Sequence, residues 1–425
     1  MLHANQRLTE LYFQSDSCVR CGRCTTVCPT YRVTRREPMV ARGRIWLARQ
    51  FVEGRLGLSS TLKLYNDSCL GCQACRAVCP PGIKVDELVA EVKQTIQGRL
   101  GLTLEDKMIL KACSHPQSFR YLVGTLDLSR RMGTTRLLPK RLRQKVRMFP
   151  QPPPRTFMDW LKLQKTPDTA GRPKIGYFPG CLTNSIFPGI AMAVLEVLKP
   201  QGVQVVVPPA VLCCGQPHRV AGELTESRRL AIAIMNFFLG QGVDFVVTSC
   251  GSCGYSLQEY AADFRDDPIW REPAERFAGK CRDIMEYLVG VAGLSVGPQA
   301  LPGITVTYHD SCHLNRRLGI AAQPRELLAA LPGARYAEMP RADWCCGAAG
   351  SYSFRHPDIA RKILALKTED ARSIRPDVVT AGCPSCLMQL GYGSRIFDGN
   401  YDVCHPVELL AATFDHARNN RWLSL

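Results

Sequence analysis

Eight cysteines near the amino terminus repeat one spacing. The pattern is Cys-x2-Cys-x2-Cys-x3-Cys-Pro, and its two copies comprise Cys18, Cys21, Cys24 and Cys28, then Cys69, Cys72, Cys75 and Cys79. Three thiolates at this pitch can hold three irons of one cubane, while the fourth, followed by proline, ligates the other cluster. We therefore expect two cubane [4Fe–4S] clusters, one held by Cys18, Cys21, Cys24 and Cys79 and the other by Cys69, Cys72, Cys75 and Cys28. Zinc is the alternative, but its usual motifs lack the x3-Cys-Pro end.

Ten further cysteines form two sets of five. The sets are Cys181, Cys213, Cys214, Cys250 and Cys253, then Cys312, Cys345, Cys346, Cys383 and Cys386. The intervals agree, with 31 and 32 residues before the Cys-Cys pair and 35 and 36 after it. The agreement indicates an internal repeat with one metal site per copy. Five thiolates suit an open cluster in which one sulfur bridges two irons. A conventional cubane, structural zinc and a strained disulfide between neighbouring cysteines remain alternatives.

Three cysteines have no partner spacing, namely Cys113, Cys281 and Cys404. Buried free thiols behave as small apolar residues, so we expect all three to be structural. His309, Asp310 and His313 flank Cys312. They are candidates for acid–base groups, but a capping or hydrogen-bonding role beside the metal site is the preferred interpretation.

The elements around the ten cysteines alternate between strand and helix. Short β-type runs occur at 174–178, 203–207, 245–248, 304–309 and 378–381, with helical stretches such as 190–198 between them. This alternation predicts a parallel sheet in each repeat. The cysteines directly follow strands, at the carboxyl ends where open α/β sheets gather ligands.

The eight amino-terminal cysteines have helical surroundings instead. Apolar residues recur at helical spacing in 39–53 and 86–97, and Asp86 is the expected N-cap of the second helix. The predicted fold is α/β with an α-helical ferredoxin domain. The predicted domains are a helical ferredoxin domain with two clusters at 16–100, a basic helical connector with a proline-rich linker at 101–172, and two α/β repeats at 173–300 and 301–425.

Composition excludes several classes of protein. The chain has 425 residues, of which 46% are apolar, so wholesale disorder is excluded. It shows no secretory signal and no apolar run near the ~20 residues that span a bilayer. The 21 cysteines of so long a chain therefore favour metal binding in the cytoplasm over disulfides. Residues 1–15 carry no functional expectation.

The net charge of +17 belongs almost wholly to the first 170 residues. That part holds 29 Lys and Arg against 13 Asp and Glu, and the densest basic run is 129–148. No interleaved aromatic residues or nucleic-acid-binding module accompany it, so nucleic acid is not the expected partner. The run is either a solvated helix face or a docking surface for an acidic flavoprotein or an anionic membrane. We expect a cytoplasmic location, with a peripheral position on the inner membrane face as the alternative.

The carboxy-terminal part resembles the cysteine-rich CCG domain family, whose signature is Cys-x(31–39)-Cys-Cys-x(35–36)-Cys-x2-Cys. The resemblance covers 174–410 and implies a [4Fe–4S] cluster, noncubane in heterodisulfide reductase subunits, in each repeat.

The whole chain resembles the glycolate oxidase iron–sulfur subunit family. The resemblance includes Pro29-Thr30-Tyr31, Arg42-Gly43-Arg44-Ile45 and the Cys345-Cys346-Gly347-x2-Gly350-Ser351-Tyr352 motif. It implies an electron-transfer subunit that serves an FAD-containing 2-hydroxy-acid (glycolate or lactate) dehydrogenase. An electron-transfer flavoprotein or a quinone-linked membrane protein is a further possible partner. No GxGxxG fingerprint or P-loop occurs, so flavin and nicotinamide are expected only on partners.

The CxxC pairs Cys250/Cys253 and Cys383/Cys386 are complete, whereas some members of the glycolate group lack one of these cysteines. The alternative function is therefore a catalytic subunit like heterodisulfide reductase, which reduces a disulfide at a noncubane cluster. Whether the chain is itself an enzyme stays open at this point.

Overall fold

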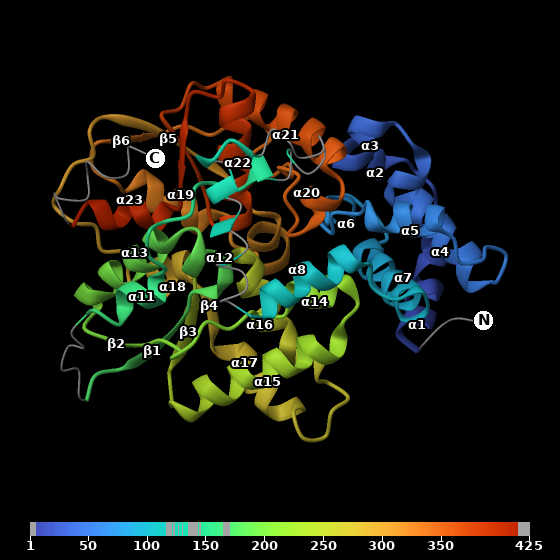
Figure 1. The fold of residues 1–425 in the computed structure, drawn as a ribbon, viewed down its shortest axis with the longest axis horizontal. Helices are drawn as coiled ribbons and strands as arrows, with labels where there is room; N and C mark the ends of the chain where they lie inside the picture. Colours follow the sequence, from blue (N-terminus) through green and yellow to red (C-terminus); the bar gives the residue numbers. More distant parts are fainter. Residues whose placement is uncertain are drawn as a thin grey trace. The chain divides into compact units, whose positions relative to one another are not determined.

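The computed structural model describes residues 6–115, 121, 124–125, 127–129, 131–134, 143, 146–164 and 171–414 (Figure 1). Most of the basic run 129–148 lies outside these residues. The chain divides into two compact units. The first contains Met1–Leu110, Pro217–Leu224 and Trp344–Lys367, and the second contains Lys111–Gln216, Thr225–Asp343 and Thr368–Leu425.

The amino-terminal domain is helical, as predicted. Its elements are α1 (Gln6–Gln14), η1 (Ser15–Ser17), α2 (Arg23–Val27), α3 (Pro29–Thr34), η2 (Glu37–Met39), α4 (Ala41–Val52), α5 (Ser60–Asp67), α6 (Ala74–Ala77), α7 (Val85–Leu100) and α8 (Leu104–Ser114). The apolar faces of α1, α4 and α7 form one core that includes Leu8, Phe51 and Val92. Five of the motif cysteines pack against this core, so the helices position both motifs: Cys18, Cys24, Cys69, Cys75 and Cys79.

The predicted N-cap of α7 was wrong. The helix begins at Val85 with Lys84 as its N-cap, and Asp86 lies inside the first turn. The Asp86 carboxylate is buried and accepts a hydrogen bond of 3.0 Å from Gln73 Nε2. A buried carboxylate needs such a partner, and its partner here is a side chain from the second cysteine motif.

Each repeat of the carboxy-terminal part contains a parallel sheet, as predicted, and each sheet has four strands. The first sheet has the order β2-β1-β3-β4, with β1 at Lys174–Phe178, β2 at Gln204–Val206, β3 at Phe245–Thr248 and β4 at Cys281–Asp283. The second has the order β6-β5-β7-β8, with β5 at Ile304–His309, β6 at Ala334–Tyr336, β7 at Val378–Ala381 and β8 at Asp402–Cys404. The same strand order in both sheets confirms the repeat.

Helices follow the strands in both repeats. The first repeat has α11 (Phe157–Leu161), α12 (Gly180–Ser185), α13 (Pro188–Leu198), η4 (Lys199–Gln201), α14 (Gln216–Ala221), α15 (Leu224–Gly240), α16 (Gly251–Asp263), α17 (Arg271–Lys280) and α18 (Ile284–Gly290). The second has a π-helical turn η5 (His313–Arg317), α19 (Ala322–Ala329), α20 (Tyr352–Arg355), α21 (Pro357–Arg372), α22 (Pro384–Ile396) and α23 (Pro406–Ala412). No helix among the described residues combines the length and the apolar character that crossing a membrane requires.

The edge strands of the two sheets lead into helices with the same kind of cap. Asp283 caps α18 in a capping box with Glu286, and His405 caps α23 in a capping box with Glu408. The Glu408 carboxylate is buried and accepts a hydrogen bond of 2.8 Å from the His405 backbone N–H. Burial raises the pKa of Glu408 from 4.5 to about 8, although this hydrogen bond acts in the opposite direction.

The buried Glu408 makes stability depend on pH. Its pKa is higher in the folded state, so its contribution is complete below about pH 4.5 and is lost as pH rises through about 8. We expect the urea midpoint of the protein to fall between pH 6 and pH 9, with a contribution of a few kcal/mol at most (about 1.4 kcal/mol per pKa unit) from this carboxyl. Glu408→Gln should flatten the profile, and Glu275→Gln, at an exposed site, should not. A profile unchanged by Glu408→Gln would contradict the assignment.

Candidate metal centres

The two amino-terminal motifs share one backbone conformation around their second cysteine. The residues before and after Cys21, Arg20 and Gly22, have φ values of 53° and 84°. The equivalent residues around Cys72, Gly71 and Gln73, have φ values of 63° and 58°. Left-handed residues on both sides of a cysteine curl the chain into a tight loop. Both loops are therefore shaped to present several thiols to one point.

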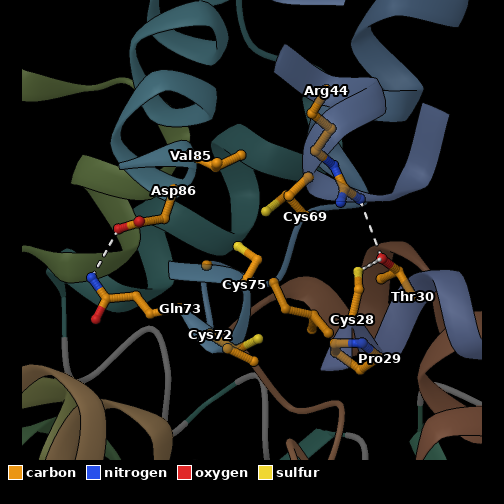
Figure 2. A pocket seen from close by; sticks show the side chains of 14 residues that line it. Cys28, Pro29, Thr30, Arg44, Cys69, Cys72, Gln73, Cys75, Val85 and Asp86 are labelled. Atoms are coloured by element: carbon orange, nitrogen blue, oxygen red, sulfur yellow. Dashed lines mark hydrogen bonds between the residues drawn. The ribbon is translucent and has the colours of Figure 1, made fainter. Parts of the chain in front are cut away.

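A pocket lies where the second loop meets the last cysteine of the first motif. Its lining includes Cys69, Cys72 and Cys75 together with Cys28 (Figure 2), and the space between the lining residues, including the part that is open to solvent, is about 390 Å³. In Figure 2 these four cysteines lie around the pocket, and three come from one loop. This donor set fits a [4Fe–4S] cubane with crossed ligation. We propose these four cysteines as its ligands.

Cys28 is held in position by the start of α3. It has an extended backbone, with φ −75° and ψ 115°, and Pro29 is the first residue of the helix. A residue before proline avoids the helical region, so the chain turns at Cys28. Its Sγ lies 3.2 Å from Thr30 Oγ1, which donates a hydrogen bond of 2.7 Å to the Met39 carbonyl oxygen.

A buried cation lies beside the Cys28–Cys69 side of the pocket. Arg44 is 2% exposed and donates hydrogen bonds to the Met39 carbonyl, to Thr30 Oγ1 and to Ser68 Oγ. Burial acts to lower the pKa of Arg44, but the neighbouring thiols raise it above its ordinary value. A cubane with four thiolates carries about −2, so this guanidinium would compensate part of that charge.

The other amino-terminal set is more open to solvent. Cys21 is exposed, while Cys18, Cys24 and Cys79 are partly buried. Burial raises the pKa of the Cys24 thiol; Arg42 acts to lower it, and Cys28 and Cys18 raise it further. We propose Cys18, Cys21, Cys24 and Cys79 as the ligands of the second cubane.

The first carboxy-terminal set of five comes together in the second unit. Cys213 is hydrogen-bonded to Cys181 and Cys214, Cys214 to Cys253, and Cys253 to Cys250. A Cβ atom at Gly180, where φ is 74°, would lie 2.9 Å from the Cys253 sulfur. Only glycine therefore allows this approach.

The backbone around the first set is also fixed by hydrogen bonds. The carbonyl oxygen of Cys214 accepts hydrogen bonds from Ser256 Oγ at 2.7 Å and Tyr260 Oη at 2.8 Å. The five thiols fit one metal centre.

Cys113 lies near this set, which sequence reasoning missed. Burial raises the pKa of its thiol, and the neighbouring Cys181 and Cys214 raise it further. The end of α8 is held there because Ala112 packs against Ile186, and Ser114 Oγ donates a hydrogen bond of 3.1 Å to Glu226. Cys113 has no counterpart in the repeat spacing, so no signal in the sequence connected it to the set. The first set therefore has a sixth thiol close by.

The second set of five is divided between the two units. Cys345 and Cys346 belong to the first unit, whereas Cys312, Cys383 and Cys386 belong to the second. Cys383 is hydrogen-bonded to both Cys386 and Cys250. The Gly251 N–H also donates a hydrogen bond of 2.9 Å to the Gly382 carbonyl. Equivalent cysteines of the two repeats, Cys250 and Cys383, therefore lie side by side. We propose all five cysteines of this set as ligands of one cluster.

The polar residues around Cys312 have different surroundings. Asp310 is buried and pairs with Arg325 through two hydrogen bonds of 3.0 and 2.9 Å. His313 Nδ1 lies 3.1 Å from Ser252 Oγ, which in turn lies 3.5 Å from the Cys383 sulfur. A ring nitrogen of His309 lies within 4.8 Å of the Cys386 sulfur. Asp310 thus has a structural ion pair, and the two histidines lie around the thiols.

The two remaining cysteines lie in edge strands. Cys281 is in β4 and Cys404 in β8, and both are buried. Cys281 Sγ lies 3.3 Å from the Phe277 carbonyl oxygen. These placements are consistent with a structural role for both thiols.

The crossed ligation can be tested with single serine variants. Cys28→Ser should weaken the same EPR signal as Cys69→Ser, although residue 28 belongs to the first motif. Cys18→Ser should weaken the other signal. Each variant should lose up to about four irons per chain. A Cys28→Ser variant that shares its lost signal with Cys18→Ser would show that each motif binds its own cluster.

Arg44 is expected to set the potential of the Cys28-containing centre. One unit charge near a partly buried site changes the energy of another by about 1–4 kcal/mol. Arg44→Met should therefore lower the midpoint potential by an amount on the order of 100 mV, and Arg44→Lys by less. Arg55→Met, at an exposed site, is the control in an EPR-monitored redox titration. An unchanged potential in Arg44→Met would exclude this role.

Comparison with known proteins identifies two domain families in this chain. The 4Fe-4S dicluster domain family matches residues 14–83, and the cysteine-rich CCG domain family matches residues 175–258 and 306–391. The probable glycolate oxidase iron–sulfur subunit of Bacillus subtilis is 31% identical over 94% of both chains. Lactate utilization protein A of Oceanobacillus iheyensis is 32% identical over 56% of this chain and 96% of its own. The protein of the same name from Geobacillus thermodenitrificans is 33% identical over 51% of this chain and 90% of its own. The full-length similarity and both matched domain families place this chain in the glycolate oxidase iron–sulfur subunit family.

Proposed function

We propose that this chain relays electrons for a flavin-dependent oxidation of a 2-hydroxy acid such as glycolate or lactate. The oxidation takes place on a partner subunit that carries FAD, and this chain carries the electrons away one at a time. The names of the relatives, a glycolate oxidase subunit and lactate utilization proteins, support this substrate class. The observation that carries the proposal is the gathering of thiols at the strand ends, where Cys250 and Cys383 connect the two repeats.

The cofactors that we propose are two cubane [4Fe–4S] clusters and one [4Fe–4S] cluster per carboxy-terminal repeat, of noncubane form where all five thiols bind. When bound, these clusters supply one-electron redox chemistry. The chain holds them, and its buried residues set their potentials. Arg44 places a positive charge beside one site, while Ser256 and Tyr260 fix the backbone of Cys214 at another. Flavin is assigned to the partner.

We also propose that the protein works in the cytoplasm, where thiols stay reduced. The basic run 129–148 is then a candidate surface for binding the partner flavoprotein or the inner membrane face. Most of this run lies outside the described residues, so the proposal rests on its charge alone.

The function can be tested by anaerobic purification of the tagged full-length chain with its native partners. We expect an FAD-containing subunit to copurify, and we expect glycolate or lactate to bleach the cluster absorption. 3-Hydroxybutyrate, which has no 2-hydroxyl group, is the control substrate. A complex without flavin, or clusters that no 2-hydroxy acid reduces, would contradict the proposal. Disulfide-dependent oxidation of a reduced viologen by the chain alone would instead support the alternative, a disulfide reductase.

A further inference from the structure

The segment Trp344–Lys367 of the second repeat belongs to the same compact unit as the helical domain. Three contacts fix it there. The Arg32 guanidinium lies 3.9 Å from the Trp344 ring centroid, and Arg355 forms an ion pair of 2.9 Å with Asp106. His356 is hydrogen-bonded to the backbone of Asp67. These contacts lie on α3, which follows Cys28, on α5, which precedes Cys69, and on α8.

Tyr352 lies in the middle of this segment. It is 5% exposed, and its neighbours include Arg44, Cys69, Cys28 and Cys345. Its ring also packs against His356, with the centroids 4.9 Å apart and the ring planes tilted by 44°. Tyr352 thus interacts electrostatically with two cysteines of the Cys28-containing centre and with Cys345 of the Cys-Cys pair of the second repeat.

The Tyr352 hydroxyl has no hydrogen-bond partner within the part of the chain that the structure describes. A buried hydroxyl without a partner is unfavourable because it has lost its hydrogen bonds to water, so buried polar groups of this kind usually have a partner such as a ligand or water. The neighbours of Tyr352 are the thiols that we propose as cluster ligands. No cysteine sulfur in the described part of the chain accepts a hydrogen bond from this hydroxyl, so the acceptor that we propose is a sulfide of the cluster.

The first repeat differs at the equivalent position. Counted from the Cys-Cys pairs, Tyr352 corresponds to Val220, which is 44% exposed. The first-repeat segment that joins the helical unit, Pro217–Leu224, approaches α7, where the Cβ position of Gly222 faces Gln94 and Gln97. A buried aromatic side chain beside the amino-terminal thiols is therefore a feature of the second repeat.

We propose that the Tyr352 hydroxyl donates a hydrogen bond to the cluster held by Cys28, Cys69, Cys72 and Cys75, and that this cluster exchanges electrons directly with the second repeat through Cys345. The proposal rests on the relay function and adds the order of the relay. One electron moves from one cluster to the next, and no bond forms or breaks. Tyr352 acts as a positioning residue that raises the potential of the cluster.

The hydrogen bond is tested with Tyr352→Phe in the full-length holoprotein, because this change removes only the hydroxyl. We expect unchanged iron content, a lower midpoint potential for the Cys28-containing cluster, and loss of one exchangeable-proton coupling when EPR spectra in H₂O and D₂O are compared. Tyr287→Phe is the matched control, since Tyr287 is also buried but packs against Phe245 in the second unit. An unchanged potential together with an unchanged proton coupling would overturn the assignment.

The order of transfer is tested by rapid-freeze EPR after mixing with a limiting amount of reductant. Cys345→Ser and Cys213→Ser, at equivalent positions of the two repeats, identify which signal belongs to which repeat. We expect the second-repeat signal to appear first in the wild type and to appear several-fold more slowly in Tyr352→Phe. If the first-repeat signal appears first, or Tyr352→Phe leaves the rate unchanged, the proposed order is wrong.

These readouts are independent of the proposed function. They use a chemical reductant, so they remain valid if no 2-hydroxy acid reduces the clusters. Conversely, hydroxy-acid-dependent reduction with no effect of Tyr352→Phe would overturn the order and leave the function intact.

Discussion

The close approach of thiols that must give up their protons is the constraint on which this fold depends. Buried thiolates repel one another, and burial disfavours their charged form. Two thiols illustrate this cost, because burial raises the pKa of Cys75 and Cys113 well above the usual range of a thiol. Metal ions reverse the effect by binding the thiolate. The protein offsets the remaining cost of gathering the thiolates through hydrogen bonds, tight loops and the buried guanidinium of Arg44.

Much of this arrangement could be predicted from the sequence. The strands at 174–178, 245–248, 304–309 and 378–381 have the bounds expected from their apolar β-branched and aromatic residues. The strands β4, β6 and β8 were missed, because each has only three residues and includes a charged side chain, whereas the equally short β2 lies in the apolar run 203–207. The spacing of the cysteines also indicated which thiols lie close together, since equal intervals between cysteines indicate equivalent loops in the two copies.

Other features depend on contacts between distant parts of the chain. Asp86 was expected to cap its helix, but the helix begins one residue earlier, at Val85, and the Asp86 carboxylate accepts a hydrogen bond from the distant Gln73 instead. Cys113 lies 68 positions before Cys181, and only the packing of α8 brings it to the first set. Tyr352 was visible as part of a motif, yet its neighbours Arg44 and Cys69 lie far away in sequence. Sequence patterns predict local geometry well, but they predict contacts between residues that are distant in the sequence poorly.

The pocket that contains Cys28 and the second loop also bears on how the chain folds. A cluster held by these residues would tie Cys28 to Cys69 and close a loop of about 40 residues. Closing a loop of this size removes conformational entropy from the unfolded chain worth about 4 kcal/mol, as estimated for a disulfide. Helices α3, α4 and α5 lie inside the loop. The stability of this helical region would then depend on the supply of iron, since these helices gain their cross-link only when the cluster is inserted.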